Sequence, residues 1–465
     1  MVDVVLIYPF FRPQHDRSIF RFPPLGLGYI ASYLRAHNIS AEMIDCTFIT
    51  KEEALRRARS HDPSVIGIYT MYTMEENSLQ FAKSLRDDCD LLVAGGPLPS
   101  VFPEKFLHDF DIVAIGEGEQ TMLDVTLASN NGHGLTAISG IAHNGAHRVT
   151  GTDEPTNSSI VRNPQRAFIE NLDTLPLPAR DLFDNQAYQE YYKKTFGQAV
   201  TSVMTSRGCP YKCDFCSKPV FGDVFRARSA ANVVDEIEDV LSYGYESVFF
   251  QDDCFTLDER RVFNICEEIL RRGLKLNWEC LSRVDAINLD LLSKMKQAGC
   301  RRVFFGIESG NNDVLKIMNK QLTIEQAKRA VELTASSGLK TGAFFILGYP
   351  GETDRTVLET IRFATSLPLN YLSFTLPYPI PGTGLYEKVK DRLNSKNPNS
   401  AAPKRHQLID HSLNFECDFS ERKLKMAIAK ATIQFRIRRY LGRSLYLLIG
   451  KPFEILTDVI FKALS

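Results

Sequence analysis

The sequence contains no uninterrupted apolar run of the roughly 18 residues that a membrane-spanning helix needs. The N-terminus, MVDVVLIYPFFRPQ, has an acidic residue at position 3 and an apolar run too short for a secretory signal. Charge of neither sign is in excess, because 55 lysines and arginines stand against 56 aspartates and glutamates and leave a net charge of -1. We therefore expect a cytoplasmic protein without a nucleic-acid partner, since no global field attracts nucleic acid.

A disulfide framework is not expected either, because cysteines in a reducing compartment remain thiols, metal ligands or small buried apolar residues. Seven of the ten cysteines are scattered singly, and we expect them to be small buried apolar residues. These are Cys46, Cys89, Cys254, Cys266, Cys280, Cys300 and Cys417. Only three cysteines are clustered, and all three lie between residues 209 and 216.

The length of 465 residues exceeds what a single hydrophobic core serves, so two or three domains are expected. Over residues 1–145, short runs rich in valine and isoleucine alternate with helical patterns, which is typical of a doubly wound, Rossmann-like parallel sheet. Ligands of such sheets bind beyond the carboxyl ends of the strands. There, Gly95, Gly96 and Gly116 would let the backbone approach a large flat or phosphate-bearing ligand, or would be ordinary turn glycines. A nicotinamide dinucleotide is not expected, because no G-x-G-x-x-G follows the first strand.

The rest of the chain divides into three parts. From about residue 130 the sequence loses periodicity and gains glycine, asparagine and proline, which indicates a hairpin and an extended linker, placed at residues 146–195. Residues 196–388 contain about six strand-helix units, fewer than the eight of a closed barrel, and predict a partial (β/α)6 barrel. Residues 389–465 are helical and locally basic. This C-terminal segment either packs across the barrel mouth or forms a surface for a membrane or an apolar, anionic substrate.

The clustered cysteines lie in the stretch TSRGCPYKCDFCSKP, directly after a predicted strand, at Cys209, Cys213 and Cys216. Three thiolates cannot complete a four-coordinate structural zinc site, and no fourth ligand follows at a suitable spacing. Three thiolates can, however, hold three corners of a [4Fe-4S] cluster and leave one iron open to bind another group. The missing fourth ligand is then the functional feature.

This C-x3-C-x2-C motif after a barrel strand resembles that of the radical S-adenosylmethionine (SAM) superfamily. The resemblance implies that Cys209, Cys213 and Cys216 hold the catalytic cluster and that the amino and carboxylate groups of SAM chelate the open iron. It also implies that an electron from the cluster cleaves a carbon-sulfur bond of SAM and gives a 5'-deoxyadenosyl radical. A low-potential donor such as flavodoxin or ferredoxin would supply that electron.

The same resemblance places SAM contacts at six further positions, which are Tyr211, Phe215, Asp252, Arg283, Glu308 and Gly348. The two aromatic residues lie within the cysteine loop, where relatives pack an aromatic ring near adenine. The guanidinium of the arginine suits a carboxylate. Gly348 belongs to FILGYPGET, which resembles the glycine-rich turn that approaches adenine. The alternative for each carboxylate is a helix cap or a surface ion pair.

The domain that precedes the barrel resembles the cobalamin-binding subclass of the superfamily, through PPLGLGYIASYL and DIVAIGEGEQTMLD. That subclass includes cobalamin-dependent radical methyltransferases and the anaerobic magnesium-protoporphyrin monomethyl ester cyclase. The resemblance implies cobalamin at Gly95, Gly96, Gly116 and Glu117, with a cobalt that lacks a histidine ligand because the chain has no D-x-H-x-x-G motif. A methylthiotransferase would need N-terminal cysteines for a second cluster, and is disfavoured.

Three functions remain open on the sequence. The first is methylation of an unactivated carbon of a small-molecule or lipid-like substrate, and the second is a radical oxidative cyclisation or ring rearrangement with the same cofactors. The third, a cobalamin or redox sensor without turnover, is disfavoured because a sensor needs no residues to orient SAM. The basic and aromatic C-terminal segment suggests a hydrophobic substrate and peripheral contact with a membrane surface.

Overall fold

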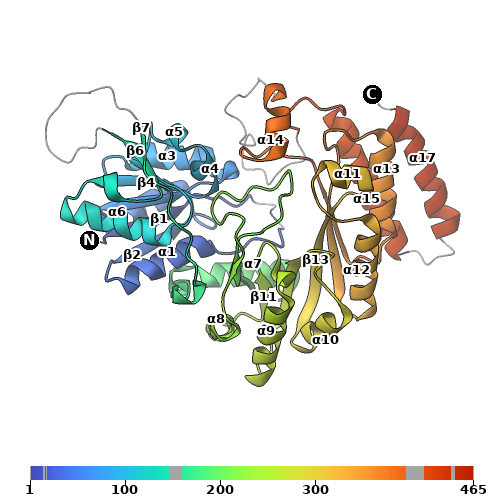
Figure 1. Ribbon diagram of the computed structural model, residues 1–465, viewed down its shortest axis with the longest axis horizontal. Helices are drawn as coiled ribbons and strands as arrows, with labels where there is room; N and C mark the ends of the chain where they lie inside the picture. The colour runs from blue at the N-terminus through green and yellow to red at the C-terminus, as the bar shows by residue number, and fades with distance from the viewer. Residues whose placement is uncertain are drawn as a thin grey trace.

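The computed structural model describes residues 2–13, 16, 18–145, 160–393, 413–440 and 446–463. Two α/β units lie side by side, and the C-terminal helices are attached to the second unit at its side away from the first (Figure 1).

The first unit is built on a seven-stranded sheet with the order β2-β1-β3-β4-β5-β6-β7. Strands β1 to β5 pair in parallel, while β6 and β7 are added antiparallel as the predicted hairpin. The strands are β1 (Val4–Tyr8), β2 (Ala41–Asp45), β3 (Val65–Tyr69), β4 (Leu91–Gly95), β5 (Ile112–Ala114), β6 (Ile141–Asn144) and β7 (Ile160–Arg162).

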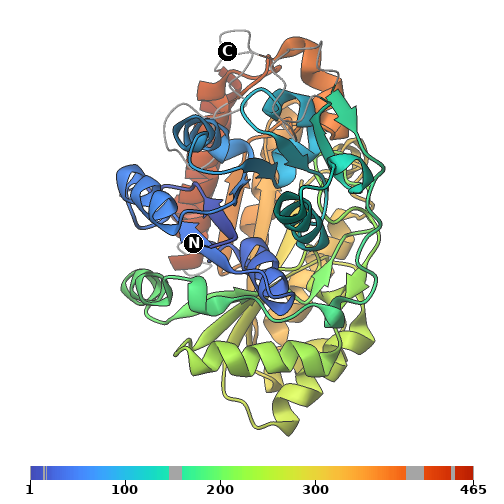
Figure 2. The same ribbon diagram turned by 90° about the vertical axis from the view of Figure 1, so that its left-hand side faces the viewer.

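Helices cover both faces of this sheet, as Figure 2 shows from the side of the first unit. Val4 and Leu6 of β1 face one core, with α1 and α6, whereas Val5 and Ile7 face the other, with α2 and α3. Burial on both faces explains why the strands read as continuous apolar runs. The helices are α1 (Leu25–Ala36), α2 (Lys51–His61), α3 (Glu75–Leu85), α4 (Pro97–Val101), α5 (Pro103–Phe106) and α6 (Glu119–Asn131).

The connection between the units contains a helix that the sequence analysis did not predict. Residues 146–159 of the expected linker lie outside the described residues, but α7 (Asn185–Phe196) follows two 3-10 turns at Leu172–Thr174 and Arg180–Leu182. Asp184 caps α7 by accepting a hydrogen bond from the Ala187 amide. The prediction of an extended linker was therefore wrong here, because tyrosines on α7 find partners only in the folded chain.

The second unit is a six-stranded, all-parallel sheet with the order β15-β14-β13-β12-β11-β8. The edge strands β8 and β15 do not pair with each other, so the barrel is partial, as predicted. Its strands are β8 (Val200–Val203), β11 (Ser247–Phe250), β12 (Asn277–Ser282), β13 (Cys300–Glu308), β14 (Lys340–Ile346) and β15 (Tyr371–Thr375). Its helices are α8 (Ala230–Ser242), α9 (Glu259–Arg271), α10 (Leu289–Gln297), α11 (Asn312–Ile317), α12 (Ile324–Ser336) and α13 (Asp354–Ser366).

Aromatic side chains from the first unit pack on the inner face of this sheet. The ring of Phe20, from the segment between β1 and α1, lies 5.2 Å from that of Phe249 and 5.7 Å from that of Phe304, measured between centroids. Phe22 stacks on Phe249 at 5.3 Å and on Tyr192 of α7 at 5.5 Å. These contacts join the two units through a shared apolar cluster.

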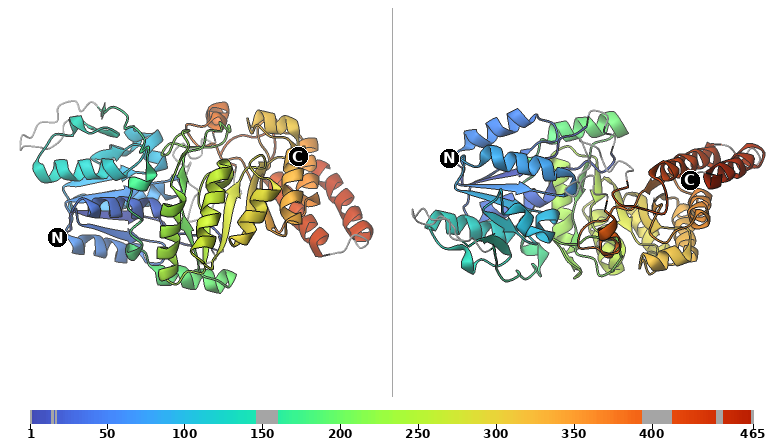
Figure 3. Two further views of the ribbon diagram at one scale, coloured as in Figure 1. Left: turned by 60° about the horizontal axis from the view of Figure 1, so that its bottom comes forward. Right: turned by 90° about the horizontal axis from the view of Figure 1, so that it is seen from above.

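The C-terminal segment contains α14 (Gly384–Val389), α15 (Glu421–Tyr440), a π-helical turn at Tyr446–Gly450 and α17 (Lys451–Ala463). Helix α15 packs along α13 and β15, and α17 packs against α13 and α15, so the pair lies along the outside of the barrel (Figure 3). Parts of this segment before α15 lie at the mouth, where the amide of Leu385 in α14 donates to the carbonyl oxygen of Asp214 at 2.9 Å and Phe415 joins an apolar cluster with Phe215. The beginning of α15 also reaches the mouth, where Leu424 contacts Gly348. None of the helices described here is both long enough and apolar enough to cross a bilayer.

Candidate active site

The cysteine loop is an excursion between two short strands, β9 (Ser206–Arg207) and β10 (Arg226–Ala227), which pair antiparallel and close its base. Gly208 begins the loop with a φ of 81°, in the left-handed region that glycine tolerates. A Cβ at Gly208 would lie 2.2 Å from the carbonyl oxygen of Val224. The loop can therefore leave β9 only through a glycine.

Several polar contacts hold the loop in place between its ends. The Nζ of Lys218 donates to the carbonyl oxygens of Cys209 and Tyr211, at 2.6 and 2.7 Å. The Asp214 amide donates to the carbonyl oxygen of Met318 at 2.9 Å, which ties the loop to the segment after α11. The loop that carries the three cysteines is thus fixed both by its own side chains and by the barrel.

The three thiols lie close enough to influence one another electrostatically. Burial and the nearby Asp253 carboxylate raise the pKa of Cys209 above its usual value. Cys216 is exposed to solvent, yet the protein around it and Asp253 raise its pKa to about 12. The thiols of Cys209 and Cys216 would be protonated at neutral pH unless a metal held them as thiolates.

No group of three histidine, cysteine or acidic side chains among the described residues is arranged to hold a single metal ion. The three cysteines on one loop are nevertheless a donor set that suits three corners of a [4Fe-4S] cluster.

Arg283, at the carboxyl end of β12, lies against the cysteine loop. Its guanidinium carbon is 3.5 Å from the centre of the Tyr211 ring. Its nitrogens donate to both carboxylate oxygens of Asp285 at 2.9 Å, and to the carbonyl oxygens of Lys320 and Gln321. Because these donors are already used, the arrangement favours Arg283 as a residue that positions Tyr211 and the Lys320 backbone.

A buried ion pair lies next to this arginine. The Nζ of Lys320 donates to Glu308 Oε1 at 2.9 Å and lies 5.6 Å from the centre of the Phe215 ring. Burial alone would lower the pKa of Lys320, but the Glu308 carboxylate and Cys213 raise it above the usual value. A charged ammonium is thus held beside the cysteine loop.

Sequence reasoning predicted Glu308 but missed Lys320, because Lys320 follows α11 in a turn that belongs to no motif. Glu308 has a φ of 73° at a β-bulge in β13. A Cβ at Gly306 would lie 2.6 Å from Glu308 Oε1, so this glycine makes room for the carboxylate. Only the tertiary structure brings these residues together.

The two aspartates after β11 have different surroundings. Asp252 is buried and accepts hydrogen bonds from the amides of Thr205 and Ser206 at 2.6 and 3.2 Å, and from Arg261 at 3.3 Å. Asp252 therefore fixes the chain that enters the cysteine loop. Asp253 is the aspartate that faces the cysteines, and burial together with Asp252 raises its pKa.

Gly348 lies in the turn after β14, with a φ of 87°. Glu352 Oε2 accepts the amides of Gly348 and Tyr349 at 2.7 and 3.0 Å, so it closes the turn. Burial raises the pKa of Glu352 to about 7 in spite of these hydrogen bonds. Leu424 of α15 packs against the turn, since a Cβ at Gly348 would lie 2.4 Å from it.

The glycines predicted for cobalamin lie at the carboxyl ends of the first sheet, where Gly95 is the last residue of β4 and Gly96 and Gly116 follow β4 and β5. Gly96 has a φ of 104°, and a Cβ there would lie 2.8 Å from the carbonyl oxygen of Thr70. Gly116 has a φ of 84° and faces the carbonyl oxygen of Val220 in the cysteine loop, 3.8 Å from the position of a Cβ. A Cβ at Gly95 would lie 3.8 Å from the Cβ of Ala114.

Glu117, the fourth predicted cobalamin residue, has its carboxylate fully engaged by protein. Glu117 Oε1 accepts from Arg207 at 2.8 Å, and both of its oxygens accept from Arg226 at 2.9 Å. The amide of Ile169 donates to Oε2 at 2.8 Å. The structure thus places Glu117 between the two α/β units.

Unpaired polar atoms lie close to the same sheet edge. Within the described part of the chain, three buried oxygen atoms near this edge have no hydrogen-bond partner, namely the phenol oxygen of Tyr72, just after β3, Glu75 Oε2, and the phenol oxygen of Tyr378, after β15. The rings of Tyr72 and Tyr378 are 5.9 Å apart, one from each unit. Buried polar groups normally find partners, so a polar ligand between the units fits these residues.

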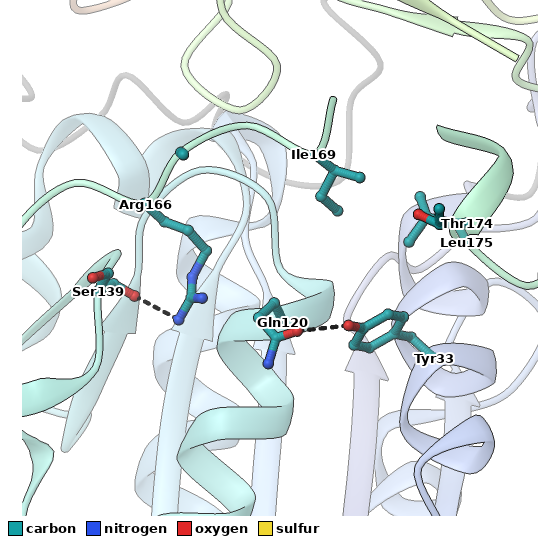
Figure 4. Close-up of a pocket in the computed structure, with 8 residues that line it drawn as sticks. Tyr33, Gln120, Ser139, Arg166, Ile169, Thr174 and Leu175 are labelled. Carbon is teal, nitrogen blue, oxygen red and sulfur yellow. Dashed lines mark hydrogen bonds between the residues drawn. The ribbon is translucent and has the colours of Figure 1, made fainter. Parts of the chain in front are cut away.

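A pocket of about 370 Å³ lies elsewhere, between α1, α6 and the linker (Figure 4). Within it, the Tyr33 hydroxyl donates to Gln120 at 2.6 Å and Arg166 donates to the carbonyl oxygen of Ser139 at 2.9 Å. None of the residues predicted for the cluster, SAM or cobalamin lines it. This pocket is therefore separate from the candidate site at the cysteine loop.

Two family models match the chain. One, described as the radical SAM superfamily, matches residues 203–364, and the other, described as the B12 binding domain, matches residues 18–126. The chain is 34% identical over 379 residues to an uncharacterized methyltransferase of Pyrococcus horikoshii, with 78% of each protein covered. It is 28% identical over 409 residues to the anaerobic magnesium-protoporphyrin IX monomethyl ester cyclase of Rubrivivax gelatinosus, covering 84% of this chain and 70% of that protein.

Two solved structures have the same fold. The cobalamin-dependent SAM radical enzyme OxsB, with aqua-cobalamin bound, aligns with a TM-score of 0.76 at 18% identity, covering 99% of this chain and 72% of that chain. The radical SAM methyltransferase TsrM of Kitasatospora setae, with cobalamin and a [4Fe-4S] cluster bound, aligns with a TM-score of 0.69 at 20% identity. The alignment covers 84% of this chain and 75% of that chain.

The chain belongs to the radical SAM superfamily. Within it, the chain is a cobalamin-dependent radical SAM enzyme, because a B12 binding domain precedes the radical SAM domain. Its cofactors are a [4Fe-4S] cluster, SAM and cobalamin, which confirms the cofactors and the fold predicted from the sequence. The domain bounds and the individual site residues remain predictions.

Proposed function

We propose that this enzyme transfers a methyl group to an unactivated carbon of a small-molecule or lipid-like substrate. The observation that carries the proposal is the direct contact between the two cofactor regions. Glu117, in the loop after β5 of the B12 binding domain, accepts hydrogen bonds from Arg207 and Arg226 at the two ends of the cysteine loop. Radical formation and methyl supply would then occur next to each other. The similarity to a protein named as a methyltransferase, at 34% identity, supports the same conclusion.

The bound cofactors would supply an organic radical that removes a hydrogen atom from the substrate and a methyl group that replaces it. The chain's own residues would hold and orient them. Cys209, Cys213 and Cys216 would hold the cluster. The Lys320 ammonium would pair with the carboxylate of SAM, while Arg283 keeps Tyr211 and the Lys320 backbone in position.

The proposed cobalamin position is the sheet edge beside Gly96 and Gly116. Their left-handed backbone keeps side chains out of that edge. The phenols of Tyr72 and Tyr378 would hydrogen-bond to the amide groups of the corrin side chains, because none of the described residues is a partner of these phenols. Removing both hydroxyls, with Tyr72→Phe and Tyr378→Phe, should weaken cobalamin binding measured by equilibrium dialysis, and an unchanged affinity would contradict this position.

The deciding experiment uses anaerobic protein reconstituted with iron, sulfide and hydroxocobalamin, then given SAM, a low-potential reductant and extract of the source cells. S-adenosylhomocysteine and 5'-deoxyadenosine are quantified together. Equal amounts of both are expected if one methyl group moves for each radical formed. Formation of 5'-deoxyadenosine alone would overturn methyl transfer.

The second candidate is a radical oxidative cyclisation or ring rearrangement without methyl transfer. The observation that favours it is the 28% identity to the anaerobic magnesium-protoporphyrin IX monomethyl ester cyclase over 84% of this chain. An isotope label that passes from the methyl group of SAM into the product would exclude it.

In either case we propose a flavodoxin or ferredoxin as the electron donor, because the cluster must be reduced at low potential.

We also propose that α17 brings the enzyme to an anionic membrane surface. Six large apolar residues of α17 and the π-helical turn before it are each at least 44% exposed, namely Leu448, Ile449, Ile455, Leu456, Val459 and Ile460. Acidic residues of the helix face inward, where Asp458 pairs with Lys430 at 2.6 Å and Glu454 with Arg362 at 3.4 Å. Lys451 and Lys462 are exposed, so the outer face is apolar and basic, which suits anionic lipid.

A further inference from the structure

The two ends of the cysteine loop are held by a single carboxylate of the other domain. Arg207, the last residue of β9, and Arg226, the first residue of β10, are paired in register at the base of the loop. Both donate to Glu117, as described above, and Glu117 directly follows Gly116 at the predicted cobalamin edge. Only Gly208 separates Arg207 from Cys209.

A second carboxylate of the same domain completes the network. Arg207 Nη2 donates to Glu119 Oε1 at 2.6 Å, and Glu119 is the first residue of α6. Arg226 also donates to the carbonyl oxygens of Ile169 and Phe221, at 2.8 and 3.1 Å. The network therefore joins the B12 binding domain, the linker and both ends of the cysteine loop.

The charges in this network are removed from water. Glu117, Glu119, Arg207 and Arg226 are 6%, 3%, 4% and 7% exposed. The Arg207 guanidinium lies 5.3 Å from the Tyr29 ring of α1 and 5.0 Å from the Phe221 ring of the loop, which shield it. Removing one partner from a buried charge network leaves the others uncompensated, so its geometry is held tightly.

We infer that Glu117, Arg207 and Arg226 are positioning residues that set the placement of the cluster relative to cobalamin. The inference rests on the proposed function, which requires the two cofactors to cooperate. Glu117 can serve in this way because its carboxylate is fully used by protein and is not needed to contact a ligand. The loop it holds carries the cluster, and the residue before it, Gly116, lies at the cobalamin edge.

The variant that tests this inference is Glu117→Gln, which removes the charge and keeps the shape. Its matched control is Asp124→Asn, which breaks the contact of Asp124 with Arg166, a 2.5 Å pair that does not touch the cysteine loop. In the protein without cofactors, amide hydrogen exchange over residues 208–225 should become about tenfold faster in Glu117→Gln and stay unchanged in Asp124→Asn. Equal exchange in the two variants would overturn the inference.

In the loaded enzyme, the readout is the magnetic interaction between cob(II)alamin and the reduced cluster, measured by electron paramagnetic resonance. We expect a weaker or broader interaction in Glu117→Gln at unchanged iron and cobalamin content. If Glu117→Gln shows faster exchange in the loop but keeps the magnetic interaction of the wild type, the inference is also overturned. Neither readout needs a methylated product, so failure of the proposed methyl transfer would not be mistaken for failure of the inference.

Arg226→Lys provides a second test if Glu117→Gln does not fold. Lysine keeps the positive charge but cannot contact Glu117, Ile169 and Phe221 at once. It should give a smaller increase in exchange over residues 208–225 and the same direction of change in the spectrum. Wild-type behaviour of this variant by both readouts would contradict a positioning role.

Discussion

The guanidinium carbon of Arg283 lies 3.5 Å from the centre of the Tyr211 ring, a contact between the end of β12 and the part of the cysteine loop just after Cys209. The three cysteines lie within residues 209–216, whereas Arg283 follows a strand more than sixty residues later in the chain. A cation over an aromatic face is attracted to it and limits where the ring can move. The loop is therefore held within the cysteine motif as well as at its ends.

The stacking predicts different effects for two substitutions of Tyr211. Tyr211→Phe keeps the ring, so the KM for SAM in uncoupled SAM cleavage should stay within about twofold, whereas Tyr211→Ala should raise it about tenfold because the cation-π contact is lost. The measurement is 5'-deoxyadenosine formation at varied SAM concentration. Equal KM values in the two variants would show that the ring does not matter.

The cluster assignment predicts the metal content of two cysteine variants. Cys213→Ser should lower iron from about four per chain to less than half of that after anaerobic reconstitution, because one of three thiolate ligands is lost. Cys89→Ser, a half-buried cysteine outside the loop, is the control and should keep full iron. Iron and sulfide analysis, together with visible absorption, measures the cluster content of both variants. Loss of iron in Cys89→Ser but not in Cys213→Ser would refute the assignment.

The buried pair of Lys320 and Glu308 predicts non-additive effects on stability. Lys320→Met leaves a buried carboxylate unpaired and should lower the free energy of unfolding by about 3 kcal/mol. The double variant Lys320→Met/Glu308→Gln should recover part of this loss, since no charge remains buried. Denaturant unfolding of the cofactor-free chain measures the coupling. Additive losses would mean that the two side chains do not interact.

Glu352 predicts a pH dependence of stability with a defined sign. Burial raises its folded pKa to about 7 from 4.5, so its favourable contribution is fully present below about pH 4.5 and is lost as the pH rises to 7 and above. The difference in unfolding free energy between wild type and Glu352→Gln should change over this window by on the order of 3 kcal/mol. A difference that stays constant with pH would contradict a buried, protonatable Glu352.

The apolar face of α17 predicts binding to vesicles. The protein should sediment with phosphatidylglycerol vesicles and only weakly with phosphatidylcholine vesicles, and Leu456→Glu/Val459→Glu should reduce binding at least about tenfold. Leu289→Glu, at a residue 55% exposed on α10, is the matched control and should bind as wild type does. Loss of self-association instead of lipid binding in the double variant would identify the face as a contact between copies.

Most of the architecture could be predicted from the sequence because it depends on local and periodic information. Alternation of apolar strands with helical patterns predicted both sheets, and the count of about six units predicted the partial barrel. The C-x3-C-x2-C spacing predicted the cluster loop, since ligands on one loop are brought together by the chain itself. Helix α7 was missed because its tyrosines are explained only by the clusters they join.

What only the tertiary structure decided is how the polar side chains are used. Asp252, Arg283 and Glu117 were predicted as ligand contacts from the resemblance to the family, but the fold pairs their polar atoms with protein groups. Lys320 belongs to no motif, yet folding buries it beside Glu308. Sequence spacing determines which groups lie on one loop or one strand, whereas long-range pairing of buried charges depends on the whole fold, because each buried group must find its partner there.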